Sequence, residues 1–297
     1  MDSNLLKIEI VIPVYNRRDT TLQSLRSLSR INKDGLNVHI IIVDDGSTDG
    51  TSEAIEREFP EVQIIKGDGT LHYAAGTNRG IEAALKNEPD YIVCMNDDTV
   101  VHSEFLQRML KTAKANPRSV VGALLLLWDQ PHRVFQVAPH WDTFKGGWQH
   151  PDDLTAFTVP QTAFEVEGIV GNCVLYPVEV IREVGLMDEK RFPHGWGDIQ
   201  YTVKMRKAGW KLLIEPKAYV WNEPNTYPKP LHTMPKKEIL KTLFVNRRHP
   251  VNLHRQFIAR WESAPTKIAS VVGFCVYLLT LAGKFLRFSL KGRTPNF

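Results

Sequence analysis

The sequence predicts an α/β protein built on a doubly wound, mostly parallel sheet. Apolar runs of strand length alternate with amphipathic helical segments through the first 127 residues, and this alternation is typical of βαβ units with right-handed crossovers. Several of the runs are apolar throughout, as in strands that are buried on both faces. Polar residues follow three of these strands directly, which indicates a ligand site at one edge of the sheet.

The expected elements follow one another in regular order. A first strand at residues 8–14 precedes a helix with an apolar face of leucines every three residues, for which Asp19 is the expected N-cap. The later strands are expected at 38–43, 62–65, 91–95, 120–127 and 211–214, with regularity also at 166–176. The later helices are expected at 52–59, 74–86, 103–115 and 177–184, and from Gly197-Asp198 onward. Periodicity fades between residues 128 and 165.

Three polar clusters stand at the predicted strand ends. They are Tyr15-Asn16, Asp44-Asp45 and Asn96-Asp97-Asp98. The carboxyl ends of parallel strands share one edge, so these clusters are expected to meet there. Two adjacent carboxylates such as Asp97 and Asp98 repel each other unless a positive group lies beside them. The sequence therefore predicts a site that needs a cation.

Composition narrows the class of protein. The chain has 297 residues, 43% of them hydrophobic and 24% charged, which is ordinary for a globular protein. The net charge of +4 is too small to indicate a nucleic-acid partner. The three cysteines, Cys94, Cys173 and Cys275, form no CxxC pair and indicate a reducing compartment. The first 16 residues lack the pattern of a secretory signal.

The loop after the first strand excludes two common phosphate-binding devices. Residues 13–18 read PVYNRR and contain no glycine, whereas a dinucleotide-binding domain needs G-x-G-x-x-G there. A P-loop sequence is also missing. Phosphates bound at this edge would need another source of positive charge, and a divalent metal held by carboxylates is the expected one.

Four segments together resemble the family 2 glycosyltransferases, which have the GT-A fold. They are VIPVYNRRDTTLQSLRSL, IIVDDGSTDGT, NDDT and GWGDIQYTVKMRKAGW, spread over residues 7–222. The resemblance is to bacterial rhamnosyl-, glucosyl- and N-acetylglucosaminyl-type transferases of surface polysaccharide synthesis. It implies an inverting, Mn²⁺- or Mg²⁺-dependent transfer from a UDP- or dTDP-sugar to a glycan or lipid-linked saccharide, with guanine donors known among relatives.

The resemblance also implies roles for residues of the nucleotide-binding half. Asp98 matches the metal ligand of the family's D-x-D motif, Asp97 would face the donor, and Asn96 stands where many relatives carry another acid. Either Asp44 or Asp45 would accept a hydrogen bond from the base. The remaining donor-binding residues that it implies are Pro13, Tyr15, Asn16, Asn78, Gly171 and Asn172.

Asp198 is the expected catalytic base. It lies in GWGDIQY, where the family places the carboxylate that deprotonates the acceptor hydroxyl. Gly197 and Gln200 replace acids that many relatives carry. Trp196 and His194 flank the base and are expected to contact the acceptor, because aromatic rings stack on sugar faces.

The expected organisation is a GT-A domain over residues 1–222, with a nucleotide-binding half at 1–127 and an acceptor half at 128–222, followed by a basic, helical region at 223–297. Residues 268–283 are uncharged but shorter than the ~20 residues that span a bilayer. Basic residues follow, which favours a helix lying on the inner face of the cytoplasmic membrane over a buried core helix. A cytoplasmic, peripheral enzyme is therefore expected.

Two other functions share these features. A non-catalytic sugar-nucleotide-binding protein would have the same fold, but the presence of both Asp98 and Asp198 argues against it. A nucleotidyltransferase shares the sheet and the metal carboxylates, but would need a glycine-rich, basic loop after the first strand.

Overall fold

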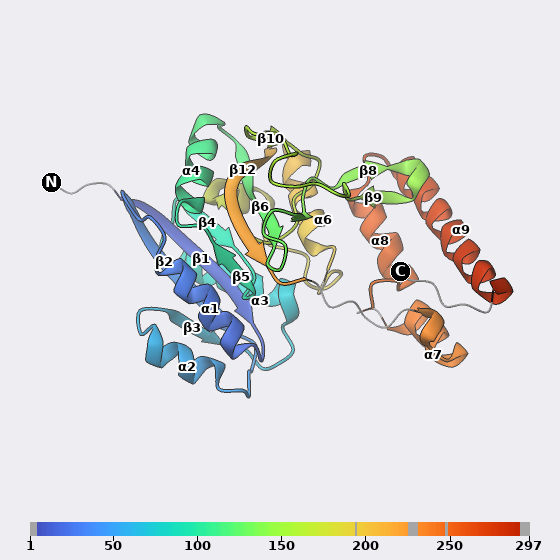
Figure 1. Ribbon diagram of the computed structural model, residues 1–297, viewed down its shortest axis with the longest axis horizontal. Helices are drawn as coiled ribbons and strands as arrows, with labels where there is room; N and C mark the ends of the chain where they lie inside the picture. Colours follow the sequence, from blue (N-terminus) through green and yellow to red (C-terminus); the bar gives the residue numbers. More distant parts are fainter. Residues whose placement is uncertain (1–4, 194, 225–230, 247–248, 292–297) are drawn as a thin grey trace. The chain divides into compact units, whose positions relative to one another are not determined.

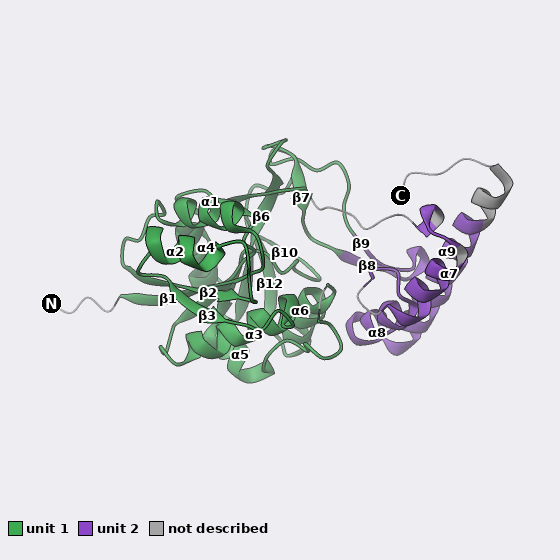
Figure 2. Cartoon of the chain, turned by 90° about the horizontal axis from the view of Figure 1, so that it is seen from below, with its two compact units in different colours: residues 1–139, 150–224 green, residues 140–149, 225–297 purple. Residues whose placement is uncertain are grey.

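The computed structural model describes residues 5–193, 195–224, 231–246 and 249–291 (Figure 1). The chain forms two compact units (Figure 2): unit 1 comprises residues 1–139 and 150–224, and unit 2 comprises residues 140–149 and 225–297. Unit 2 therefore contains, besides the C-terminal region, ten residues from the expected acceptor half.

Unit 1 contains the predicted α/β sheet. Its strand order is β10-β12-β6-β11-β4-β1-β2-β3, with β5 paired to β12 and β7 paired to β6. The pairs β1–β2, β1–β4, β2–β3 and β12–β6 are parallel, which confirms the mostly parallel sheet. The strands are β1 (Leu6–Val14), β2 (Leu36–Asp44), β3 (Gln63–Lys66), β4 (Tyr91–Cys94), β5 (Thr99–Val101), β6 (Ser119–Leu127), β7 (Val134–Gln136), β10 (Phe164–Glu165), β11 (Val174–Pro177) and β12 (Lys211–Asn222).

Helices cover both faces of this sheet, as a doubly wound fold requires. Figure 2 shows α1, α2 and α4 on one side and α3, α5 and α6 on the other, and their buried side chains belong to two separate apolar clusters. The helices are α1 (Arg18–Leu28), α2 (Thr51–Glu58), α3 (His72–Leu85), α4 (Phe105–Ala115), α5 (Val178–Val184) and α6 (Gly197–Lys207).

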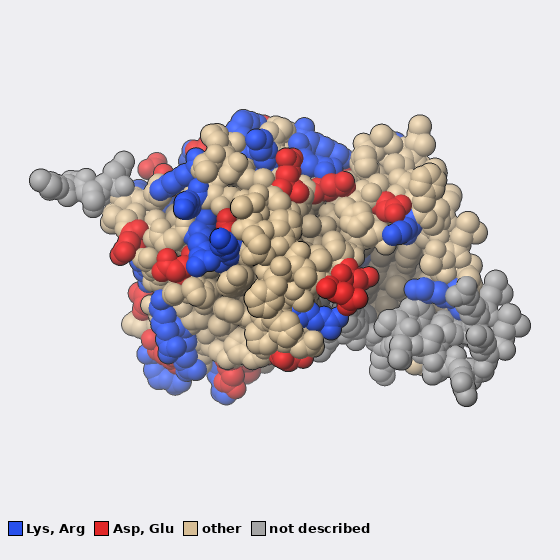
Figure 3. Space-filling view, turned by 45° about the horizontal axis from the view of Figure 1, so that its top comes forward, with Lys and Arg blue, Asp and Glu red and all other residues tan. Residues whose placement is uncertain are grey.

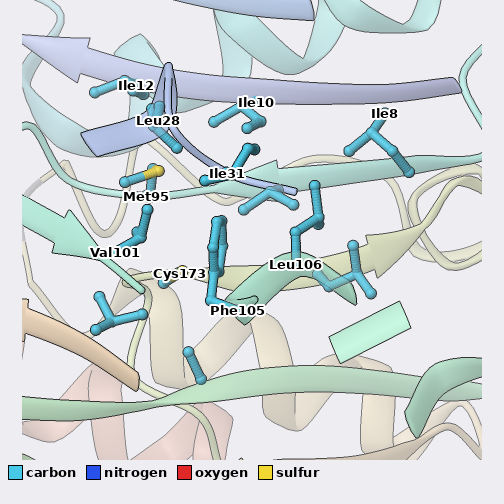
Figure 4. Close-up of a cluster of buried hydrophobic side chains, with 14 of the residues drawn as sticks. Ile8, Ile10, Ile12, Leu28, Ile31, Met95, Val101, Phe105, Leu106 and Cys173 are labelled. Carbon is cyan, nitrogen blue, oxygen red and sulfur yellow. The ribbon is translucent and has the colours of Figure 1, made fainter. Parts of the chain in front are cut away.

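The core on the α1 side follows from strand periodicity. Ile8, Ile10 and Ile12 point to the same face of β1 and are fully buried. Figure 4 shows Ile12 and Ile10 near Leu28 of α1, in the same cluster as Phe105 of α4. Burying each such side chain contributes roughly 1.5–3 kcal/mol to folding. This packing fixes the position of the strands, and therefore of the polar residues that follow them at the sheet edge.

Two local expectations are corrected. The helix α1 begins at Arg18, and Asp19 lies in its first turn without capping it. The carboxylate of Asp49 instead accepts a hydrogen bond from the main-chain amide of Arg18 at 3.0 Å. Within the expected regular segment at 166–176, only residues from Val174 onward are in a strand, β11, and this strand runs antiparallel between β4 and β6.

Unit 2 consists of a β-hairpin and helices. The hairpin is formed by β8 (His140–Asp142) and β9 (Gly147–Gln149), joined by the 3₁₀ turn η1 (Thr143–Lys145). The other elements are η2 (Leu231–Thr233), α7 (Lys236–Leu240), the π-helical turn η3 (Lys241–Val245), α8 (Leu253–Ser263) and α9 (Lys267–Lys291). Within the described residues, α9 is the one helix whose length and composition would allow it to cross a membrane, over Lys267–Phe285.

Candidate active site

The three polar clusters meet at the carboxyl edge of the sheet because their strands are parallel neighbours. Val14 at the end of β1 pairs with Asp44 at the end of β2. On the other side of β1, Val11 pairs with Cys94, the last residue of β4. Asn16, Asp45 and Asp97 therefore follow adjacent strands at the same edge.

Arg17 lies between the two aspartates that follow β4. Its Nη1 atom is 3.1 Å from Oδ1 of Asp97 and 3.1 Å from Oδ2 of Asp98. Its Nη2 atom is 3.2 Å from Oε2 of Glu223. Burial raises the pKa of Asp97 to about 7, although Arg17 opposes the rise and the charge of Asp98 adds to it. The pair therefore still favours additional positive charge.

Two asparagines hold the turn that carries these aspartates. The Oδ1 atom of Asn172 accepts hydrogen bonds from the amide of Asn96 at 2.9 Å and from the Thr99 hydroxyl at 3.2 Å. At the end of β12, Asn222 donates to the same hydroxyl at 2.9 Å and to Oδ1 of Asp98 at 3.4 Å. Because Asn172 and Asn222 are both buried, the direction of the Asp98 carboxylate is set by the protein.

Asp198 lies in the first turn of α6 and is bound from the facing loop. Its Oδ2 atom accepts a hydrogen bond from the amide of Gly171 at 2.8 Å. A β-carbon on Gly171 would lie 2.5 Å from Cβ of Asp198 and 2.8 Å from the hydroxyl of Tyr73. That hydroxyl donates to the carbonyl of Gly171. Glycine is therefore required for this close approach, and the pKa of Tyr73 is raised by burial and by Asp198, which keeps its hydroxyl protonated as a donor.

Consecutive residues thus connect the expected base to the expected metal ligand. Gly171 binds Asp198, and Asn172 binds the turn that carries Asp97 and Asp98. Both contacts come from the loop just before β11, which lies between β4 and β6. The antiparallel strand therefore positions the site as well as filling the sheet.

The aspartates after β2 accept hydrogen bonds from the surrounding loops. Asp44 accepts from the amide of Ser47 at 2.8 Å and from the Ser52 hydroxyl, and its Oδ2 atom lies 3.6 Å from Nζ of Lys66. These hydrogen bonds outweigh burial and lower the pKa of Asp44.

Asp45 organises the loop before α3. Its Oδ1 atom accepts from the amides of Gly69 at 2.9 Å and Leu71 at 3.2 Å, and its Oδ2 atom accepts from His72 at 3.0 Å. Asp45 is 6% exposed, against 1% for Asp44. Its Oδ2 atom accepts one hydrogen bond within the protein, which leaves capacity for a second.

The other expected donor-site residues differ in accessibility. Tyr15 is 54% exposed at the sheet edge. Asn16 accepts from the amide of Thr48 at 2.7 Å and so holds the turn after β2. Pro13 is half-buried, and Asn78 is buried on α3, where its amide group bonds the main chain of Met187 and the carboxylate of Glu189.

The two expected acceptor residues lie before α6. His194 lies outside the described residues. Trp196 is half-buried and has a left-handed backbone (φ 63°) immediately before the helix that carries Asp198.

On the face drawn in Figure 3, basic and acidic side chains of the described residues are interspersed, and neither sign forms a continuous patch.

A divalent cation at this edge would need ligands besides the side chains of the described residues. Among the described residues, no group of three or more His, Cys, Asp or Glu side chains converges on one point. The hard carboxylate oxygens of Asp97 and Asp98 suit Mg²⁺ and Mn²⁺, which often bind through one or two carboxylates plus substrate phosphates. Trp221 offers no metal ligand, because its indole N–H is a donor only and bonds the carbonyl of Pro131.

Sequence reasoning missed Arg17, Asn222, Glu223 and Tyr73. Arg17 directly follows Asn16, one of the residues expected to bind the sugar donor. Its position after the first strand places a basic side chain at the edge where the aspartates were expected, and this could have indicated an ion pair. Asn222 and Glu223 lie in a segment that reads as a domain boundary. Their contacts with Asp98 and Arg17 span 124 and 206 positions in the chain, so local pattern carries no trace of them.

Comparison with known proteins decides the family. The sequence profile described as "Glycosyl transferase family 2" matches residues 9–185. The chain belongs to glycosyltransferase family 2. This membership confirms the predicted family and enzyme class.

Curated relatives of this glycosyltransferase act in glycan synthesis. It is 27% identical over 204 residues to N-acetylglucosaminyl-diphospho-decaprenol L-rhamnosyltransferase of Mycobacterium tuberculosis, covering 62% of this chain and 66% of that protein. It is 26% identical over 227 residues to the succinoglycan biosynthesis protein ExoA of Rhizobium meliloti, covering 75% and 64%. The chain thus spans just under two thirds of the length of these relatives.

Solved structures confirm the GT-A fold. A crystal structure of GalNAc-T7 with UDP, GalNAc and Mn²⁺ matches 92% of this chain and 54% of that one, with a TM-score of 0.61 and 15% identity. Staphylococcus aureus TarS (residues 1–349) matches 97% and 76%, with a TM-score of 0.54 and 14% identity. The agreement covers the mixed α/β architecture with its mostly parallel central sheet.

Proposed function

We propose that this glycosyltransferase transfers a sugar, with inversion, from a UDP- or dTDP-sugar to a glycan or lipid-linked saccharide in cell-surface polysaccharide synthesis. One observation carries the proposal. The adjacent residues Gly171 and Asn172 contact two different parts of the site: Gly171 binds Asp198 on helix α6, and Asn172 binds the turn that carries Asp97 and Asp98. These two contacts support the proposal that Asp198 acts as the base and that Asp97 and Asp98 receive a cation at the same sheet edge.

Asp198 is proposed as the general base. Its carboxylate accepts the proton of the acceptor hydroxyl while that oxygen bonds to the anomeric carbon of the donor sugar. The bond between the anomeric carbon and the diphosphate oxygen breaks, and the electron pair leaves with the nucleotide. Attack opposite the leaving group inverts the anomeric centre. The Gly171 amide orients Oδ2, so Asp198 needs no rearrangement before it acts.

Asp98 and Asp97 are proposed to receive the metal-bound diphosphate. When bound there, Mn²⁺ or Mg²⁺ would neutralise the charge that develops on the leaving group. Asn222 and Asn172 hold the turn so that the carboxylates present their oxygens together. Arg17 is proposed to keep the carboxylate pair in place before the donor arrives, because its guanidinium bridges both side chains.

The nucleoside is proposed to bind beside β1 and β2. Tyr15 and Pro13 would line the base and ribose, and Asp45 would accept the ring N–H through its Oδ2 atom. We assign this role to Asp45 because Asp44 is more deeply buried and is already paired with Lys66.

A lipid-linked acceptor and membrane attachment complete the proposal. The support is a relative whose name includes a decaprenol-linked saccharide, together with the apolar helix α9. We propose that the enzyme works peripherally on the cytoplasmic face of the membrane, with Trp196 contacting the acceptor sugar.

Donor binding is the first test. Thermal shift with Mn²⁺ and a panel of UDP-, dTDP- and GDP-sugars should show one donor class that raises the melting temperature, since a ligand at 100 times its Kd stabilises by about 2.7 kcal/mol. The enzyme should then be incubated with an isotopically labelled donor sugar and extracted prenyl-diphosphate saccharides. Mass spectrometry of the saccharides should reveal the product that carries the label. If no nucleotide sugar shifts the melting temperature at any metal concentration, the proposed donor site is wrong.

A further inference from the structure

The helix α9 has one apolar face that remains exposed in unit 2. Its exposed residues recur at intervals of three and four, which places them on one stripe of the helix. Ile268 and Leu279 near its ends are 78% and 73% exposed. No charged residue occurs between Lys267 and Lys284. The exposed residues of the stripe are Ile268, Val271, Val272, Cys275, Leu279 and Ala282.

The opposite face of α9 packs within unit 2. Gly273 lies against the Trp141 ring, where an added β-carbon would be 3.2 Å from a ring carbon. The buried Arg260 of α8 donates from Nε to the carbonyl of Gly146 at 2.7 Å, and its guanidinium lies 4.4 Å from the ring centre of Tyr277. The hairpin thus contacts α9 through the Trp141 ring, and α8 contacts it through the Arg260 guanidinium on the Tyr277 ring.

This packing favours a helix that lies on a bilayer over one that crosses it. To cross, α9 would have to give up its contacts with the hairpin and α8 or take Arg260 into hydrocarbon. An arginine at the bilayer centre costs at least about 2.5–3.5 kcal/mol. A helix with one face packed on protein and one exposed apolar face is suited to the boundary between headgroups and acyl chains.

Charge supports the same partner. Unit 2 contains 14 Lys and Arg residues against 3 Asp and Glu, a formal net charge of +11. Unit 1 contains 23 against 30, a net charge of −7. The small net charge of the whole chain therefore conceals a strongly basic unit. Basic residues near an anionic membrane surface contribute about 1 kcal/mol each to binding.

We infer that unit 2 is a monotopic membrane-docking unit: α9 lies flat, with its exposed apolar stripe inserted at the surface of an anionic phospholipid bilayer. The inference deepens the membrane attachment proposed above and says which face of which helix makes it. Its test requires no sugar transfer, so its failure would leave the proposed reaction standing.

The native cysteines provide a direct measurement of depth. Cys275 is exposed on the stripe, whereas Cys94 and Cys173 are buried. An environment-sensitive fluorophore on Cys275 should shift to the blue when the full chain meets vesicles of phosphatidylglycerol and phosphatidylcholine. Labels at Ile268→Cys and Ala282→Cys, each in a Cys275→Ser background, should be quenched by nitroxide lipids at the same shallow depth as the Cys275 label.

A matched pair of variants tests the surface. Val271→Glu combined with Leu279→Glu should weaken vesicle binding at least tenfold, because two acidic groups replace apolar contacts on the stripe. Phe157→Glu changes an apolar residue of unit 1 that is even more exposed than Val271 and Leu279, and it should leave binding unchanged. Neutral vesicles or 1 M salt should also weaken binding of the parent protein, since screening reduces the attraction of the basic unit.

Three results would overturn the inference. A label at residue 275 much deeper than those at 268 and 282, with protein resistant to alkaline extraction, would show a spanning helix. A blue shift that appears without vesicles and grows with protein concentration would show that a second copy of the chain covers the stripe. Equal losses for the stripe variant and Phe157→Glu would show that the stripe has no specific role.

Discussion

The guanidinium of Arg17 lies 3.1 Å from the Oδ2 atom of Asp98. The same nitrogen contacts Asp97, so one arginine bridges the pair of carboxylates that follows β4. The sequence predicts a cation at this pair, and the protein itself supplies one. The metal-bound donor proposed above would have to share or displace this contact, so Arg17 is expected to influence how the site binds a cation.

Replacing Arg17 should expose the bare carboxylate pair. In Arg17→Gln, Mn²⁺ without donor should bind several-fold more tightly, because one competing positive charge is lost. Stability should fall by about 1 kcal/mol, a modest amount since Arg17 is partly exposed. Mn²⁺ titration followed by EPR and thermal unfolding measure the two effects. Arg18→Gln, which removes an exposed pair with Asp19, is the control; unchanged Mn²⁺ affinity in Arg17→Gln would refute the idea.

Asp198→Asn should separate binding from chemistry. The amide side chain keeps the size of Asp198 but cannot accept the acceptor's proton, so kcat should fall by at least 100-fold, the lower range for a lost general base. Donor affinity, measured by calorimetry with Mn²⁺, should change less than threefold. A variant with nearly full kcat would exclude Asp198 as the base, and a variant without donor binding would indicate a role in donor binding instead.

Gly171→Ala should disturb the base more than the fold. The added methyl group would overlap Cβ of Asp198 and the Tyr73 hydroxyl, so the helix α6 or the loop must shift. A displacement of this kind at a reacting group can reduce turnover about 100-fold. Steady-state kinetics and the melting temperature should be compared with those of Gly283→Ala, where nothing lies within 4 Å of the new methyl group. Full activity in Gly171→Ala would show that this approach is not needed.

Asn172→Ala should loosen the turn of the aspartate pair. The change leaves the part-buried amide of Asn96 without its partner and removes one of the two asparagine partners of the Thr99 hydroxyl, which costs about 1–3 kcal/mol. Donor affinity should fall together with stability, because the turn that carries Asp97 and Asp98 loses the contact with Asn172. Asn116→Ala, at the end of α4, serves as a control with a local hydrogen bond only. If Asn172→Ala lowers stability and leaves metal-dependent donor binding intact, the positioning role is wrong.

The raised pKa of Asp97 predicts a dependence on pH. A carboxyl with a folded-state pKa of about 7 binds a proton more tightly in the folded protein than in the unfolded chain. Its contribution to stability is therefore present at low pH and is lost as pH rises from about 4 to 7. Asp97→Asn should stabilise the donor-free protein at pH 8 by on the order of 1–3 kcal/mol, with little effect at pH 4.

Thermal unfolding of Asp97→Asn at both pH values checks this prediction. Protons and cations compete for Asp97, so Mn²⁺ affinity of the parent protein should rise between pH 6 and 8. Asp129→Asn, at an exposed position, should show neither effect. A larger stabilisation at pH 4 than at pH 8 would mean that the carboxyl is not held with a raised pKa.

Sequence pattern was sufficient to predict which strands carry polar residues to the sheet edge. Strand periodicity and the order of elements place Asp44-Asp45 and Asp97-Asp98 at strand ends, and the fold class follows because parallel strands end at a common edge. Asp198, in the first turn of α6, was predicted from its motif instead. Four motifs in the family's order were enough to predict the family. Each motif is short and local, so it can be recognised in the sequence without knowledge of tertiary contacts.

The groups that meet across long stretches of chain are set by tertiary packing. Arg17 and Asp98 are 81 positions apart, and Asn222 and Asp98 are 124 apart. The antiparallel direction of β11 also depends on contacts with residues that are distant in sequence. The same holds for the grouping of residues 140–149 with the C-terminal helices. Local pattern records how a segment buries its own apolar side chains. The partner of a polar side chain depends on the packing of segments that are distant in sequence, and no single stretch of sequence contains that information.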